Sequence, residues 1–270
     1  MKPWVIKIGG AVAENPAQLQ ELAQGLWLLA QEGQPWVLVH GGGKAITRHL
    51  AWLGEEPIFV EGLRKTSTEA MSLVEMTLSG LINKQLVRLL QKEQPELAHQ
   101  VLGLSGVDLN IFTCQTLNPL LGRVGQVTQV QTKSLNHLLD SGYKIVLSPV
   151  SRGAEGEAFN VNADDAAGSL AAALQAERMV YISDVSGVLD AHKQVIPLLY
   201  PQLAQELTEA GVIQGGMIPK VRNCFEQIKA GIGSILIGDW PGLSTFKSFL
   251  HTGQGWGTSF TQSKPGTNLT

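Results

Sequence analysis

Three charged side chains occur at positions of the sequence where a charge is unusual or exceeds structural need. Lys7 interrupts an otherwise apolar stretch directly before Gly9-Gly10, and buried strands rarely contain an unpaired lysine. Lys220 lies in the first turn of an expected helix, where a cation opposes the helix dipole. Asp164 belongs to the segment 159–167, which holds more Asn and Asp residues than a helix N-cap needs. An edge-strand lysine and an ordinary cap are the purely structural alternatives.

Two glycine-rich turns could bind an anion. Gly41-Gly42-Gly43 follows the apolar residues 37–40 and precedes a helical pattern, and Gly9-Gly10 offers a second turn of the same kind. Such turns expose backbone N–H groups at a helix N-terminus, where an anion is stabilised. Neither turn has the spacing of a Walker P-loop or of a dinucleotide-binding G-x-G-x-x-G motif. A single glycine turn is more often only a tight connection, but two of them after buried strands favour an anion site.

Two more segments stand at the ends of expected elements. Ser183-Asp184-Val185-Ser186-Gly187-Val188 follows the expected strand 179–182, and Gly215-Gly216-Met217 precedes the helix that carries Lys220. Each could be an ordinary turn when taken alone. Because ligands in open α/β sheets bind outside the carboxyl ends of the strands, the segment 183–188 stands where a ligand cleft is expected.

The elements that must position these residues alternate along the chain. Short Val- and Ile-rich runs without polar alternation predict strands buried on both faces of a parallel sheet. Longer amphipathic segments between them predict crossover helices, and this alternation indicates an α/β sandwich with a mainly parallel sheet. The expected strands are 4–8, 36–40, 101–104, 144–148, 179–182 and 234–237, and the expected helices are 17–31, 45–53, 69–92, 133–141, 163–174 and 220–230.

One stretch breaks this rhythm. Residues 110–131 are rich in Thr, Val, Gln and turn residues, and they predict β-hairpins inserted beside the main sheet. No Pro-, Gly- or Ser-rich linker separates two autonomous domains, so a lobe boundary is expected inside continuous structure near residue 175. The polar residues 261–270 predict a flexible tail.

Composition narrows the function class. The 270 residues are 44% hydrophobic and only 16% charged, with a net charge of −3, so no electrostatic footprint for nucleic acid or an anionic membrane is expected. Cys114 and Cys224 do not make a disulfide framework or a zinc site. The N-terminal apolar stretch is too short for a signal peptide, and no run reaches the roughly 20 apolar residues of a membrane helix. A cytoplasmic protein acting on small molecules is the expectation.

Taken together, these segments resemble the signature motifs of the amino acid kinase family, and within it those of the acetylglutamate kinases. The resemblance implies a three-layer αβα sandwich of the amino acid kinase-like fold. It also implies phosphoryl transfer from MgATP to the side-chain carboxylate of N-acetyl-L-glutamate, giving N-acetyl-L-glutamyl 5-phosphate and ADP in arginine biosynthesis. The matching motifs lie at 7–10, 40–43, 62–64, 160–164, 183–187 and 215–220, with Gly-Thr at 257–258.

The resemblance also implies catalytic roles. Lys7 and Lys220 would flank the transferring phosphoryl group and neutralise its charge, and Asp164 would hold both ammonium groups. Magnesium would be bound through nucleotide oxygens and water rather than by a protein cage, because this ion keeps much of its hydration. A carboxylate is already ionised near neutral pH, so no general base is needed. His40 is then expected to orient the glycine turn rather than to catalyse.

Substrate contacts follow from the same resemblance. Arg64 would bind the α-carboxylate of the acceptor, and Asn160 would join it at the acetamido and carboxylate end. Amides of the two glycine turns would donate to phosphate and to the attacking carboxylate, and the C-terminal segments would line the adenine and ribose pocket. The acceptor site is assigned Gly42, Gly43, Arg64 and Asn160, and the nucleotide site Gly9, Gly10, Ser183, Asp184, Val185, Ser186, Gly187, Val188, Gly216 and Met217.

Three positions depart from the usual family pattern, namely Glu61, Lys65 and Lys44. All three are expected near the acyl-amino-acid pocket, where they would weaken strict preference for N-acetyl-L-glutamate. The alternatives are a kinase of aminoadipate or carrier-bound glutamate, a non-catalytic sensor on the same fold and, with less support, a Rossmann dehydrogenase.

The lobes receive separate expected roles. Residues 1–175 would bind the acyl amino acid and form a homodimer, and residues 176–260 would bind the nucleotide. The chain begins almost at its first strand, without the additional N-terminal helix that resembles a hexamerisation arm in arginine-inhibited members. A homodimer insensitive to arginine is therefore expected.

Overall fold

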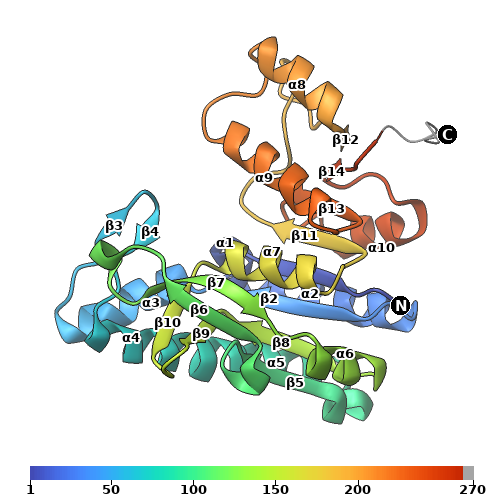
Figure 1. Cartoon of the computed structure of the whole chain (residues 1–270). Helices are drawn as coiled ribbons and strands as arrows, with labels where there is room; N and C mark the ends of the chain where they lie inside the picture. Colours follow the sequence, from blue (N-terminus) through green and yellow to red (C-terminus); the bar gives the residue numbers. More distant parts are fainter. Residues whose placement is uncertain (264–270) are drawn as a thin grey trace.

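An eight-stranded sheet runs through the protein, whose computed structural model describes residues 1–263 (Figure 1). The strand order is β12-β14-β13-β11-β1-β2-β8-β5. All pairs are parallel except β13 with β14, so the predicted α/β class with a mainly parallel sheet is confirmed. The strands are β1 (Trp4–Ile8), β2 (Trp36–His40), β5 (Val101–Ser105), β8 (Lys144–Ser148), β11 (Arg178–Ile182), β12 (Leu198–Leu199), β13 (Ser234–Gly238) and β14 (Thr258–Phe260).

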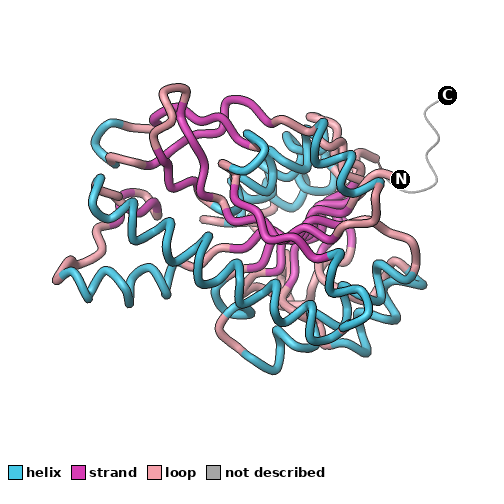
Figure 2. The backbone as a smooth tube through the Cα atoms, turned by 90° about the horizontal axis from the view of Figure 1, so that it is seen from below, coloured by secondary structure: helices cyan, strands magenta, loops and turns pink. Residues whose placement is uncertain are grey.

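Helices cover both faces of this sheet, which makes the three layers visible in Figure 2. One face packs on α2 (Pro16–Gln31), α5 (Asn83–Glu93) and α10 (Leu243–Thr252). The other packs on α6 (Lys133–Asp140), α7 (Ala163–Ala173) and α9 (Met217–Lys229), with α8 (Pro201–Glu209) beyond α9. Because both faces are covered, the central strands are mostly apolar, as parallel strands usually are, and Lys7 in β1 is an exception.

The expected helix 69–92 is one continuous rod with an irregular centre. α4 (Thr68–Glu75) begins at Ser67, whose hydroxyl accepts the amide of Ala70, and continues through the π-helical η2 (Met76–Ile82) into α5. π-Turns inside helices are frequent at functional sites. Here the η2 turn faces the glycine-rich turn after β2.

The predicted β-insertion is a single hairpin within a larger unit. β6 (Phe112–Thr116) and β7 (Val124–Val130) pair antiparallel, and both also pair with strands that were not predicted, β9 (Val150–Gly153) and β10 (Ala158–Val161). The four strands form a closed circuit beside the main sheet. Figure 1 shows this green and yellow-green unit on the same side of the sheet as α7.

Short elements complete the fold. The hairpin of β3 (Phe59–Val60) and β4 (Leu63–Arg64) was not predicted, because strands of two residues have no readable pattern. Thr261 still donates its amide to Leu199, and the remaining part of the expected tail, residues 264–270, lies outside the described residues. The other short helices are α1 (Gly10–Ala13), α3 (Gly43–Leu50), η1 (Ala51–Leu53), η3 (Pro95–Gln100), η4 (Asp108–Asn110) and η5 (Pro119–Leu121).

Within residues 1–263, none of the helices combines the length and the apolar composition needed to cross a membrane.

Candidate functional site

The candidate site lies where three adjacent strands end. β1 is flanked by β2 and β11, so the segments after all three meet at one edge of the sheet. Backbone hydrogen bonds continue past the strands: Gly9 donates to Ile182 at 3.0 Å, and Gly41 donates to Ile8 at 3.3 Å. The two glycine turns therefore start from fixed positions, as the carboxyl-end rule for open α/β sheets predicts.

Lys7 is held at this edge by Asp164. Successive strand residues face opposite sides, and Lys7 shares the face of Val5, which packs toward α7. Lys7 Nζ lies 2.8 Å from Asp164 Oδ1, and only 13% of the lysine side chain is exposed. Asp164 lies in the first turn of α7, where Asn162 is the N-cap and accepts the Asp164 amide at 2.8 Å. Since β1 is central, Lys7 is not an edge-strand lysine.

Lys220 approaches the same point from the C-terminal half. It lies in the first turn of α9 and is exposed. Together with Lys7 and Asp164 it lines a small cavity of about 80 Å³, which Ser183 and Cys224 also border. Asp164 was expected to hold both ammonium groups. Among the described residues, Asp164 makes an ion pair with Lys7 but does not make one with Lys220.

A second cavity, of about 250 Å³, adjoins the Lys7–Asp164 pair and the two glycine turns. The β3–β4 hairpin contributes Phe59, Leu63 and Arg64 to its wall, and β10 contributes Asn160. The structure thus brings two of the three predicted catalytic residues, Lys7 and Asp164, together with every residue predicted to bind the acceptor, whereas Lys220 borders only the smaller cavity. Phe59 was missed, because nothing in its short strand distinguishes it from a loop residue.

Arg64 is a buried cation in the wall of this cavity. Its Nη2 donates to the carbonyl of Gly43 and to Thr47 Oγ1, both at 2.8 Å, and its guanidinium carbon lies 4.7 Å from the centre of the Phe59 ring. Arg64 is only 8% exposed, and its buried Nη1 has no protein partner within residues 1–263. Burial lowers the pKa of Arg64. A buried guanidinium with a free donor is costly unless a ligand acceptor completes it.

His40 contacts the glycine turn that follows β2 and lines neither the acceptor cavity nor the Lys7–Lys220 cavity. Its ring is fully buried, and Nδ1 donates to the carbonyl of Gly41 at 3.0 Å. Asn83 Nδ2 lies 3.3 Å from Nε2, which is then the acceptor. Burial lowers the pKa of His40 to about 4, so the ring is neutral near pH 7. These contacts agree with an orienting role.

Gly42 leaves no space for a side chain. A Cβ at this position would meet the side chains of Leu78 and Ile82 on the π-helical η2, whereas a Cβ at Gly43 or Gly10 would meet nothing within 4 Å. The π-turn therefore packs directly against the glycine turn, and its Leu78 also lines the acceptor cavity.

The segment after β11 forms a third cavity, of about 530 Å³, in the C-terminal half. Residues 184–188 and Met217, which the family resemblance assigns to the nucleotide, line it together with Val212, Ile213 and Gln214, which were not foreseen. Ser183 borders the Lys7–Lys220 cavity instead, and Gly216 borders neither. Val188 donates its amide to Thr258 Oγ1 at 2.8 Å, which explains how the distant Gly-Thr pair belongs to this segment.

The three departures from the family pattern do not line the acceptor cavity themselves, although each is adjacent in sequence to a residue that does, and their effect on acceptor choice stays a prediction. Glu61 occupies the hairpin turn with φ of 50°, and Lys65 is exposed. Lys44 makes an ion pair with Glu14 at 2.9 Å beside a neighbouring groove. Their side chains are therefore surface features.

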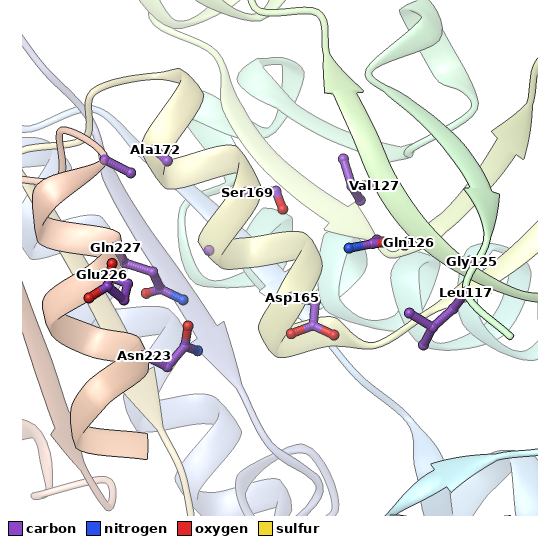
Figure 3. Close-up of a pocket in the computed structure, with 12 residues that line it drawn as sticks. Leu117, Gly125, Gln126, Val127, Asp165, Ser169, Ala172, Asn223, Glu226 and Gln227 are labelled. Carbon is purple, nitrogen blue, oxygen red and sulfur yellow. The ribbon is translucent and has the colours of Figure 1, made fainter. Parts of the chain in front are cut away.

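A further cavity, of about 410 Å³, lies between β7, α7 and α9 (Figure 3). Asp165 points into it, and burial together with the charge of Asp164 raises the pKa of Asp165. None of the predicted site residues lines this cavity. In the part of the chain that the structure describes, no group of three or more His, Cys, Asp or Glu side chains could hold a metal ion.

Comparisons with known proteins show the family and the fold. The model of the amino acid kinase family matches residues 2–239. An acetylglutamate kinase from Dinoroseobacter shibae is 40% identical over 253 residues, which cover 93% of this chain and 87% of that protein. One from Campylobacter fetus is 39% identical over 237 residues, covering 87% and 83%. The crystal structure of smu.665 from Streptococcus mutans superposes with a TM-score of 0.77 at 28% identity, covering 97% and 100%.

Proposed function

The chain belongs to the amino acid kinase family, and on that premise we propose that it is an acetylglutamate kinase. The reaction is transfer of the terminal phosphoryl group of MgATP to the side-chain carboxylate of N-acetyl-L-glutamate. The observation that carries the proposal is the guanidinium of Arg64 in the wall of a cavity that Lys7 and both glycine turns also line. A dicarboxylate fits this wall, because one carboxylate can pair with Arg64 while the other faces Lys7.

The site chemistry suits a carboxylate as the attacking group. Its oxygen forms a bond to the terminal phosphorus while the bond from that phosphorus to the bridging oxygen breaks, and ADP leaves with the electron pair. A glutamate side chain, whose ordinary pKa is about 4.3, is ionised near neutral pH, so no base is required. Catalysis then depends on alignment and on charge neutralisation. Lys7 and Lys220 border one cavity and supply that positive charge.

ATP and magnesium are the proposed cofactors. The cavity lined by residues 184–188 and Met217 is assigned to the adenine and ribose. The described residues offer no cluster of protein ligands for a metal, which fits an ion held by phosphate oxygens and water. Bound there, magnesium would reduce the negative charge on the phosphates. Gly9 and Gly10 stand beside Lys7 and are assigned to the phosphates.

The two halves of the chain are proposed to divide the substrates. All residues that line the acceptor cavity lie within 1–175, and all residues that line the proposed nucleoside cavity lie within 176–260. We also propose a homodimer formed by the N-terminal half, where Trp52, Met76 and Leu81 expose apolar side chains. Light scattering that gives the mass of a monomer would refute the dimer alone.

An ADP-release assay with MgATP tests the acceptor. N-acetyl-L-glutamate is compared with L-glutamate, N-acetyl-L-aspartate and N-acetyl-aminoadipate at equal concentrations. We expect the highest kcat/KM for N-acetyl-L-glutamate. Preference for the aminoadipate derivative would replace the acceptor and keep the reaction, whereas no turnover on any of the four would refute both.

A further inference from the structure

Thr66 lies directly behind the acceptor cavity and does not line it. It follows β4 and is fully buried, with none of its surface exposed. Its Oγ1 donates to the carbonyl of Arg64 at 3.1 Å, and Asn160 Nδ2 donates to the same Oγ1 at 3.1 Å. One hydroxyl therefore connects the two residues assigned to the acceptor, although 94 positions separate Thr66 from Asn160 in the chain.

This pair of bonds determines which way the Asn160 amide points. A threonine hydroxyl has one hydrogen, and Thr66 uses it on a carbonyl oxygen, which can only accept. The hydroxyl oxygen can then only accept from Asn160, so the amide nitrogen must face Thr66. Asn160 Oδ1 has no protein partner within residues 1–263 and remains available to a ligand N–H in the cavity that Asn160 lines.

Backbone hydrogen bonds hold the same three segments together independently of the hydroxyl. Thr66 donates its amide to Leu121 at 2.9 Å, Arg123 donates to the Thr66 carbonyl at 2.7 Å, and Asn160 donates to the Arg123 carbonyl at 2.8 Å. These bonds persist when the hydroxyl is replaced by a methyl group. Thr66→Val should therefore fold, and its effect is confined to the Asn160 side chain and the Arg64 carbonyl.

We propose that Thr66 is a positioning residue: its hydroxyl locks the Asn160 amide with Oδ1 toward the acceptor, and this lock selects an acceptor that bears an amide N–H. The proposal rests on the proposed function and deepens it. Without the hydroxyl the amide is free to turn over, so Oδ1 no longer faces the ligand in every molecule. A site built to bond an N–H rejects an analogue that lacks one, and loss of the lock weakens that rejection.

The test measures binding by calorimetry for two probes, N-acetyl-L-glutamate and its ester analogue 2-acetoxyglutarate, in which oxygen replaces the N–H. The wild type should prefer the amide by at least about tenfold, the effect of one well-formed hydrogen bond. Thr66→Val should reduce that ratio several-fold while leaving the KM for ATP unchanged. Thr66→Ser retains the hydroxyl and should restore the wild-type ratio. Thr68→Val, at an exposed neighbouring threonine, is the matched control.

The possible outcomes distinguish the proposed role of Thr66 from the proposed reaction. An unchanged amide-to-ester ratio in Thr66→Val overturns the positioning role, as does a ratio that Thr66→Ser fails to restore. Equal weakening of both probes would show a merely structural effect and also overturns it. A wild type that binds N-acetyl-L-glutamate but does not phosphorylate it refutes the proposed reaction while the ratio still tests Thr66. No binding of either probe to the wild type overturns both.

Discussion

Lys7 Nζ and Asp164 Oδ1 lie 2.8 Å apart and join the centre of the sheet to the first turn of α7. The contact aims the lysine at the edge where the two glycine turns meet. A charge in this position can act on a phosphoryl group without moving, because the strand, the helix cap and the ion pair already fix it.

Lys7→Met should lower kcat about 100- to 1,000-fold with little change in either KM. The substitution keeps the aliphatic stem and removes the charge, whose effect is greatest in the transition state. Steady-state kinetics with both substrates varied measures this. Lys2→Met, at an exposed lysine just before the same strand, serves as the control. A wild-type kcat in Lys7→Met would remove Lys7 from the mechanism.

Lys220→Met should likewise lower kcat at least about tenfold, because Lys220 is the cation that the C-terminal half brings to the cavity shared with Lys7. The same helix provides the control. Lys229 is also exposed, and its partner Glu226 lies 2.9 Å away, so Lys229→Met removes an equivalent charge outside the site. Equal kcat values for the two variants would contradict the role of Lys220.

Arg64→Lys should raise the KM for the acceptor about 10- to 100-fold and leave the KM for ATP close to wild type. Lysine keeps a positive charge but loses the planar donors, including the free Nη1. Arg88→Lys, at an exposed position of α5, controls for the exchange itself. A rise confined to the KM for ATP would show that Arg64 acts on the nucleotide and not on the acceptor.

The free energy of unfolding should depend on pH through His40. Its folded pKa of about 4 is below the ordinary value of 6.5, so the unfolded chain binds more protons between these values. The contribution is complete above about pH 6.5 and is lost as the pH falls toward about 4, with a loss of about 2 kcal/mol by about pH 5.

Urea denaturation at about pH 7.5 and about pH 5 measures this loss. His40→Asn, which keeps a donor near Gly41 but does not titrate, should be less stable at both values and lose about 2 kcal/mol less between them. Identical pH dependence in the two proteins would show that His40 does not titrate as a buried neutral ring.

Six strands of the main sheet could be predicted because they are apolar and buried, whereas the short β12 and β14 at one edge were missed. An uninterrupted apolar run such as 36–39 is readable without knowing its partners. β3, β4, β9 and β10 could not be read in this way, because they are only two to four residues long. Hairpin turns such as Glu61-Gly62 have a recognisable backbone geometry only once the structure is known.

The parts of the candidate site that lie at strand ends and in glycine turns could be predicted from the sequence. Its motif set identified Lys7, Arg64 and Asn160 before any contact was known. Contacts between distant side chains carry no such signal, which is why the hydrogen bond between Thr66 and Asn160 was not foreseen. Pairings of this kind depend on the closed circuit of strands, which positions segments that the sequence does not relate.

The order of the central strands also sets the distance between the acceptor site and the nucleotide site. The turn assigned to the acceptor follows β2 and the segment assigned to the nucleotide follows β11, with β1 between them. Neighbouring strands lie about 4.8 Å apart, so these two points are separated by roughly 10 Å. Backbone hydrogen bonds set that span, and no side-chain substitution can shorten it. A change of substrate specificity in this architecture must therefore come from the residues that line the acceptor site and the nucleotide site. The distance between the two sites stays the same.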